Sequence, residues 1–133
     1  MDFVTDTHSL IFYLSEDADE LLPKRVAKVF SESEKGKHII NIPIVVLTEI
    51  VYLVECKRVK LDIDELLERI KKGSNFRIIN FDYNIFKIFL KSSIPGIHDR
   101  MIVSTAIHLG APLITRDGEI ERSREVEVIW KTK

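Results

Sequence analysis

IHDRMIVSTAIHLGAPLITRDGEI, residues 97–120, is the segment from which the fold can be predicted most directly. Its first part contains a helical pattern of apolar residues, 99–109, that stops at Gly110, and glycine commonly ends helices. The short apolar run PLIT, 112–115, has the length and composition of a buried strand, and Asp117 with the glycine after it is typical of a turn. A helix followed by a short buried strand is a basic unit of an α/β protein.

The rest of the 133-residue chain repeats this alternation of short apolar runs and longer helical patterns. Apolar runs rich in β-branched or aromatic residues predict four more strands, at 2–5, 38–42, 77–81 and 126–130. Apolar side chains at helical spacing predict further helices at 20–34, 44–56, 62–72 and 83–92. Residues 44–56 could also form a strand because many are β-branched, but the length of the segment and Pro43 before it favour a helix. Alternating strands and helices predict a parallel sheet covered by helices.

The composition is that of a soluble globular protein rather than of a disordered or fibrous chain. Hydrophobic residues make up 45% and charged residues 31% of the sequence, and its length suits a single domain, 1–133. No apolar stretch reaches the roughly 20 residues that a membrane-spanning helix needs. The first residues lack the basic start and the apolar run of a signal peptide, so we expect a cytoplasmic protein. Cys56 is the only cysteine, which excludes an internal disulfide and a thiolate metal cluster.

Four acids are candidates for a shared site, because ligands of parallel α/β proteins bind beyond the carboxyl ends of the strands. Asp6 directly follows the first strand, and Asp117 follows the strand PLIT after one intervening residue. Asp99 opens the helix that precedes PLIT. Glu49 differs from these three because it interrupts an apolar helical segment, so the helix should bury it.

Each acid also has a simpler explanation. Asp6 and Asp99 stand where helix N-caps are found, and Asp117 could be a turn residue. Glu49 could form a buried salt bridge with an arginine. Four carboxylates at one crevice would nevertheless repel one another by about 4 kcal/mol per close pair at an effective dielectric constant of about 20. A divalent cation removes this repulsion, and oxygen ligands without His or Cys favour Mg²⁺ or Mn²⁺. Such a metal activates water and stabilises charge on phosphorus, so the acids predict phosphodiester hydrolysis.

Three segments together resemble the PIN-domain family. VTDTHSLIFYL (4–14) resembles the family's first strand and aspartate, and PIVVLTEIVYLV (43–54) resembles the segment that holds its buried glutamate. Residues 97–120 resemble its closing aspartate, helix, strand and (Thr or Ser)-x-Asp arrangement. The resemblance spans nearly the whole chain, and the order and spacing of the segments make it specific. It implies a three-layer α/β/α fold with a parallel sheet of about five strands, and hydrolysis of RNA with Mg²⁺ or Mn²⁺.

The resemblance also implies roles for residues of this chain. It implies that four acids bind the metal or position the attacking water, namely Asp6, Glu49, Asp99 and Asp117. Thr115 would hold a metal ligand or a water in place without binding the metal itself, and Thr7 is a further candidate for that role. Arg100 and Arg116 adjoin site acids, so they could contact RNA phosphates or instead form salt bridges with those acids.

The chain length matches the VapC-type toxins of this family, which form homodimers and are inhibited by an antitoxin whose tail enters the active site. The resemblance therefore implies RNA, a cognate antitoxin and a second copy of the chain as partners. PIN domains also act in RNA processing, and degenerate members that have lost acids only bind RNA or a protein. An aspartyl phosphatase would need an aspartate where His8 stands, and a receiver domain would need a lysine soon after PLIT. Since all four acids are present, we favour the nuclease.

Overall fold

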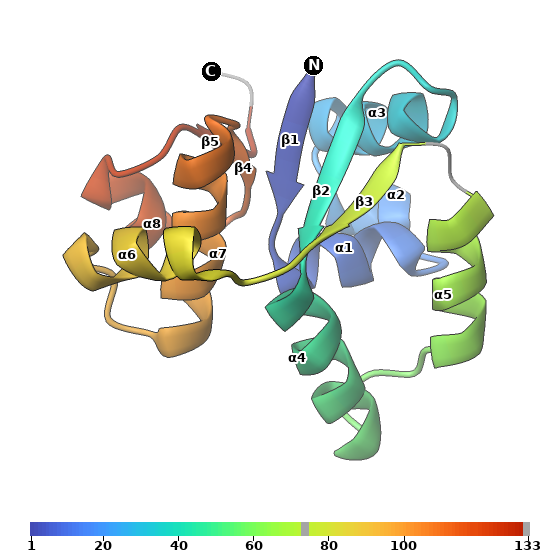
Figure 1. Ribbon diagram of the computed structural model, residues 1–133. Coiled ribbons are helices and arrows are strands. Elements are labelled where there is room, and N and C mark those ends of the chain that lie inside the picture. Colours follow the sequence, from blue (N-terminus) through green and yellow to red (C-terminus); the bar gives the residue numbers. More distant parts are fainter. Residues whose placement is uncertain (73–74, 132–133) are drawn as a thin grey trace.

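The computed structural model describes residues 1–72 and 75–131, in which five parallel strands form one sheet. The strands are β1 (Asp2–Thr5), β2 (Ile39–Pro43), β3 (Phe76–Ile79), β4 (Leu113–Ile114) and β5 (Val128–Ile129). Their order across the sheet is β3-β2-β1-β4-β5 (Figure 1). The predicted parallel sheet is confirmed, although β4 and β5 have two residues each and are shorter than the apolar runs that predicted them.

Eight helices connect the strands within the described residues. They are α1 (Thr7–Leu14), α2 (Ala18–Leu21), α3 (Lys24–Glu34), α4 (Ile44–Glu55), α5 (Ile63–Lys72), α6 (Tyr83–Lys91), α7 (Ile97–Leu109) and α8 (Gly118–Ser123). The ambiguous segment 44–56 is a helix, as predicted, and the strictly periodic segment 62–72 is confirmed as α5.

The structure differs from the predicted helices in two places. The single helix predicted at 20–34 is divided into α2 and α3, because Pro23 disfavours helical backbone at Leu22, which is extended with φ −108° and ψ 140°. Pro23 itself stands as the N-cap of α3. The helices α1 and α8 were not among the predicted helices, although the N-cap explanation of Asp6 implied a helix after it. Both begin directly after an aspartate of the candidate site.

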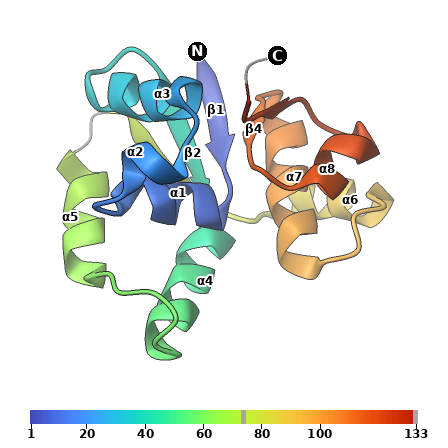
Figure 2. The same ribbon diagram turned by 180° about the vertical axis from the view of Figure 1, so that it is seen from behind.

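Helices cover both faces of the sheet. α1, α2 and α3 lie on one face, whereas α6 and α7 lie on the other (Figures 1 and 2). α7 packs on β1 and β2, and α3 packs on β2 from the opposite side. The three-layer α/β/α arrangement is therefore confirmed. No helix in the described part of the chain is long and apolar enough to cross a membrane.

The strands at the centre of the sheet are buried by these helices. Val4 in β1 and Ile40 and Ile42 in β2 have 0% exposure. Leu10 from α1 and Val103 from α7 join the same core from the two faces. Burying an aliphatic side chain stabilises a fold by about 1.5 to 3 kcal/mol, so this core holds the ends of the central strands rigidly. The candidate acids are attached to those ends.

β1 marks the point where the direction of the chain through the sheet reverses. The chain first adds β2 and β3 on one side of β1 and then returns to add β4 and β5 on the other. Connections at such a point leave the sheet on opposite faces, and a crevice opens beyond the carboxyl ends of the two strands. Thr5 of β1 pairs with Ile114 of β4, so the next residues, Asp6 and Thr115, lie at this crevice.

Candidate active site

Asp6 joins the end of β1 to the start of α1. Its backbone N–H donates to the Ile114 carbonyl (3.1 Å), and its carboxylate Oδ1 accepts a hydrogen bond from the Ser9 N–H (2.9 Å). The N-cap explanation of Asp6 is thus confirmed. Burial raises the pKa of Asp6, although hydrogen bonds from Ser9 and Thr115 and the charge of His8 oppose this shift. A cap whose ionised form is disfavoured by burial is a site where a cation would be stabilising.

Asp117 and Thr115 occupy the corresponding position after β4. The Asp117 Oδ1 atom accepts hydrogen bonds from the N–H groups of Glu119 (2.8 Å) and Ile120 (3.2 Å), so Asp117 is the N-cap of α8 rather than part of an isolated turn. The Asp117 N–H donates to the Thr115 hydroxyl (3.1 Å). This buried hydroxyl also lowers the pKa of Asp6, so Thr115 lies between the two aspartates.

Glu49 reaches the site from the middle of α4. The Thr7 hydroxyl donates to Glu49 Oε1 (2.7 Å), and Nδ1 of His98 lies 3.5 Å from Glu49 Oε2. The Glu49 side chain is 22% exposed, so α4 buries it only in part. Within the described residues Glu49 forms no salt bridge with an arginine, and that explanation of its position is wrong. Thr7 and His98 are its partners instead.

Asp99 approaches the same crevice from the first turn of α7. The helix begins at Ile97 after a glycine N-cap, so Asp99 is the third helical residue and the prediction of an N-cap there is wrong. Burial raises the pKa of Asp99, and the negative charges of three other acids raise it further, namely those of Asp117, Glu49 and Asp6. The charges of the other three acids therefore act on Asp99 across one crevice.

No lysine or arginine forms a salt bridge with any of these four acids in the part of the chain that the structure describes. In the same part of the chain, no three His, Cys, Asp or Glu side chains are close enough to bind one metal ion together. Mg²⁺ keeps several of its waters and typically takes only one or two carboxylates directly. This preference does not require a closed cage, so the donor chemistry of the four acids, oxygen atoms alone, suits Mg²⁺ or Mn²⁺ held partly through water.

The two arginines beside the site acids have different surroundings. The Arg100 Nη2 atom donates to the Ser92 carbonyl (2.7 Å), and its guanidinium carbon lies 4.7 Å from the centre of the Phe89 ring. Arg100 thus connects the first turn of α7 to α6 through these two contacts. That Arg100 contacts RNA stays a prediction. Arg116 is exposed and its guanidinium carbon lies 4.9 Å from the centre of the Phe12 ring. Neither arginine pairs with a site acid among the described residues.

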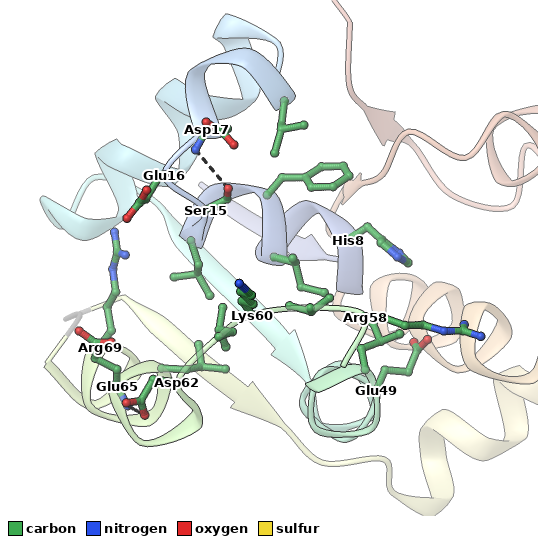
Figure 3. A pocket seen from close by; sticks show the side chains of 18 of the residues that line it. His8, Ser15, Glu16, Asp17, Glu49, Arg58, Lys60, Asp62, Glu65 and Arg69 are labelled. Atoms are coloured by element: carbon green, nitrogen blue, oxygen red, sulfur yellow. Dashed lines mark hydrogen bonds between the residues drawn. The ribbon is translucent and has the colours of Figure 1, made fainter. Parts of the chain in front are cut away.

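An open groove extends from Glu49 and His98 along α1 and the segment after α4 (Figure 3). His8 from α1 lies at the same end, and Arg58, just beyond α4, points toward Glu49 in Figure 3. Arg69 of α5 lies at the far end. From the sequence, His98 was expected to be a surface residue or a neighbour of the site acids, and Arg58 only to end the helix that carries Glu49. Their positions depend on how α1, α4 and α7 meet, which no local pattern reveals.

The sequence matches the family model of the PIN domain over residues 3–126, a span that contains all four acids of the candidate site. The chain belongs to the PIN domain family. Its acids follow β1 and β4 and lie on α4 and α7, so every element that bounds the crevice of this PIN domain is within the matched span.

Solved structures similar to this PIN domain include chains of toxin–antitoxin complexes. A chain of VapBC2 from Rickettsia felis, bound to a DNA fragment from the promoter, is 20% identical with a TM-score of 0.70, over 100% of both chains. A chain of DNA-bound VapBC from Salmonella typhimurium is 19% identical with a TM-score of 0.68, over 97% of both chains. A chain of a toxin–antitoxin complex from Klebsiella pneumoniae is 22% identical with a TM-score of 0.59, over 95% of this chain and 94% of the other. These likenesses concern the fold. No curated protein matches the chain in sequence.

Proposed function

We propose that this PIN domain is a metal-dependent endoribonuclease that hydrolyses phosphodiester bonds of single-stranded or structured RNA, and that it is the toxin of a toxin–antitoxin pair. One observation supports catalysis above the others. The pKa of Asp99 is raised by burial and by three other acids, and no lysine or arginine in the described residues forms a salt bridge with any of the four. A hard divalent cation is the ligand that such a set of oxygen atoms prefers.

The chain's own residues keep these oxygens in place. Two backbone N–H groups of α8 bind Oδ1 of Asp117, which leaves Oδ2 for a metal or water ligand. The Thr7 hydroxyl holds one oxygen of Glu49, and the Thr115 hydroxyl accepts a hydrogen bond from the Asp117 N–H. A bound Mg²⁺ or Mn²⁺ would supply a water of lowered pKa and would stabilise charge on the phosphate under attack.

The proposed substrate and biological role rest on the family and on the fold. The family match supports a nuclease, and the similar folds of chains from VapBC and other toxin–antitoxin complexes support a toxin. We accordingly propose a cytoplasmic homodimer that is inhibited by a cognate antitoxin. A PIN nuclease of RNA processing, or a scaffold that binds RNA or a protein without cleaving, are the alternatives. The presence of all four acids favours an enzyme over a scaffold.

The decisive experiment is cleavage of RNA by the purified protein with Mg²⁺ or Mn²⁺, with chelator, and with Asp6→Asn. We expect cleavage that needs the metal and is lost in Asp6→Asn. Glu34→Gln is a matched control, because Glu34 lies in the groove that Glu49 also lines but is paired with Arg69. Cleavage that persists in chelator and in Asp6→Asn would contradict the proposal, and so would RNA binding without any cleavage.

The toxin role has a separate test. Expression of the chain in bacterial cells should stop growth, whereas expression of Asp6→Asn should not. Co-expression with a small reading frame next to its gene should restore growth, and the two proteins should purify together. Light scattering of the free protein should give the mass of two copies, each of 15.4 kDa. Active nuclease that leaves growth unaffected would favour RNA processing instead.

A further inference from the structure

A second hollow adjoins the candidate active site at Asp117. Three parts of the chain line it: the start of α3 with Arg25, the β4–α8 connection with Arg116, and the residues after β5, Trp130 and Lys131. We call it the Trp130 pocket. The end of the chain reaches this place because β5 pairs with β4, whose following residues carry Asp117.

The Trp130 pocket combines positive charge with an aromatic surface. Arg25, Arg116 and Lys131 are all exposed, and none of them forms a salt bridge in the described residues. Trp130 is half-buried, since it packs against the hydrophobic core and also lines the pocket. Glu121 is the one acid of the lining besides the site aspartate. Three cations therefore face two acids, one of which belongs to the candidate active site.

Exposed arginines and lysines are usually no more than solvated surface, so their number does not define a binding site. Two further observations distinguish this pocket. Trp130 is the only tryptophan of the chain, and its side chain is partly exposed. The pocket also shares Asp117 with the four acids, so anything bound there lies next to the candidate reaction centre. Single-stranded RNA is bound by aromatic rings on which bases stack and by cations along its backbone.

We propose that the Trp130 pocket binds a nucleotide of single-stranded RNA beside the cleaved bond. The base stacks on the indole of Trp130, and the adjacent phosphates contact Arg25, Arg116 and Lys131. This inference rests on the proposed ribonuclease function and adds to it a defined subsite. An acidic peptide would also satisfy the cations, but it offers no planar group to the indole and would bring further carboxylates toward the site acids.

The single tryptophan makes the pocket directly observable. The protein is titrated, with chelator present to prevent cleavage, with a single-stranded oligoribonucleotide of about ten nucleotides, a length that matches a typical single-strand site. A duplex of the same sequence and a polyglutamate peptide are titrated in parallel. We expect saturable quenching of the Trp130 fluorescence by the single strand and much weaker quenching by the other two, because only unpaired bases can stack on the ring.

Variants then separate stacking from charge. Trp130→Ala should weaken the affinity for labelled single-stranded RNA about tenfold, and Trp130→Phe should keep most of it, because any aromatic face stacks with a base. Arg25→Gln should reduce the slope of log affinity against log salt by about 0.7, the value for one lost phosphate contact to a single strand. Lys28→Gln is the matched control, on the same helix but outside the pocket, and should leave both quantities unchanged.

The outcomes distinguish this pocket from the nuclease activity. Higher KM with unchanged kcat in Trp130→Ala and Arg25→Gln supports the subsite. Wild-type affinity and KM in both variants overturns it while leaving the ribonuclease intact, and quenching by polyglutamate as strong as by RNA overturns the nucleotide assignment. An absence of RNA binding by the wild type overturns the pocket, and the cleavage assay then decides separately on the nuclease. If Trp130→Ala does not fold, Arg25→Gln at an exposed position still decides the question.

Discussion

The two ends of the groove in Figure 3 both contain carboxylates, and their surroundings are opposite. At the far end, Glu34 accepts hydrogen bonds from Arg69 Nε (2.7 Å) and from the Tyr13 hydroxyl (2.7 Å). Burial alone would raise the pKa of Glu34, but these hydrogen bonds and the charge of Arg69 lower it overall. The near end is formed by Glu49, which belongs to the candidate active site. In that site, burial and neighbouring acids raise the pKa of Asp99, and burial raises that of Asp6.

This difference separates a carboxylate that has a cationic partner within the fold from carboxylates that we propose bind a metal. Glu34 joins α3 to α5 through Arg69 and to α1 through Tyr13, and burial beside this acid raises the pKa of the tyrosine to about 12. Asp99 has acids where Glu34 has an arginine. Under the proposed function, the fold tolerates this repulsion because a cation from outside the chain would offset it. The following predictions test this contrast.

The largest expected difference between the ends concerns catalysis. Asp99→Asn should reduce metal-dependent RNA cleavage by about 100-fold or more, because loss of a carboxylate at a metal costs at least as much as loss of its outer partners. The same variant without metal should be more stable by about 1 kcal/mol, since one source of repulsion is gone. Cleavage rates and thermal unfolding in chelator measure the two effects.

Glu34→Gln is the control for that variant at the other end of the groove. It should cleave RNA at the wild-type rate and should not gain stability, because Glu34 has a cationic partner. If Asp99→Asn lost stability in the absence of metal, the four acids would not be repelling one another and the contrast would fail.

Addition of metal should stabilise the protein through the candidate active site and not through the Glu34–Arg69 pair. At a concentration about 100 times its dissociation constant, Mg²⁺ or Mn²⁺ should raise the free energy of unfolding by about 2.7 kcal/mol. Asp99→Asn should lose most of this gain, whereas Arg69→Met should keep it. Calorimetric scans with increasing metal provide the measurement, and equal stabilisation of wild type and Asp99→Asn would place the metal elsewhere.

Thr7 is predicted to position Glu49 rather than to act on the substrate itself. Thr7→Val keeps the shape of this buried side chain and removes the hydroxyl that donates to Glu49, so kcat should fall about tenfold. Thr7→Ser keeps the donor and should retain most of the activity. Metal titrations followed by thermal unfolding should show weaker binding in Thr7→Val, a result that a purely structural role would not give.

Breaking the ion pair at the far end should have a smaller effect, and on stability only. Arg69→Met leaves Glu34 with the Tyr13 hydroxyl alone, and we expect a loss of about 1 kcal/mol, near the upper limit for a half-exposed pair. For a chain of this size the melting temperature should drop by about 4 °C. The variant should cleave RNA normally. A drop in kcat would show that the two ends of the groove are coupled.

The sequence was sufficient to predict the sheet and several helices for simple reasons. Each strand is a short apolar run, and the segment 62–72 has strict helical spacing on one face. Helix α1 was missed because its buried face includes the polar residues Thr7 and Ser9, which interrupt the apolar pattern. The exact starts of helices were also missed, since α7 begins two residues before Asp99.

The positions of Asp6, Asp99 and Asp117 at the crevice could be predicted because they follow from strand ends and crossovers. Glu49 lies within a helix, and its place in the site came from the resemblance. The resemblance also implied that Thr7 and Thr115 hold groups of the site, but it did not show which acid each hydroxyl would meet. The Thr7 hydroxyl binds an acid that is 42 residues away, and His98 meets Glu49 only because α7 packs beside α4. Arg100 illustrates the same limit, since its guanidinium binds the Ser92 carbonyl rather than the adjacent aspartate. Side-chain direction depends on packing between elements, which local sequence does not contain.

Acidification should give the smallest effects, and they should have opposite signs at the two ends. The pKa of Asp99 is raised in the folded state, so its cost to stability is present above that raised value and disappears as pH falls toward the ordinary 3.8. The pKa of Glu34 is lowered, so its contribution to stability is present above the ordinary 4.5 and disappears as pH falls through the lower folded value.

Unfolding by urea in chelator, at a series of pH values from about 7 downward, separates these contributions. The wild type should have a lower free energy of unfolding than Asp99→Asn at neutral pH. This difference should shrink as the pH falls and Asp99 takes up its proton. The wild type should have a higher free energy of unfolding than Glu34→Gln at neutral pH, and this difference should also shrink as the pH falls. It should do so at lower pH than the first difference, because the pKa of Glu34 is lowered and that of Asp99 is raised. If both differences in stability had the same sign, the ionised form of Asp99 would be stabilised in the folded chain as that of Glu34 is. The four acids would then not need a cation.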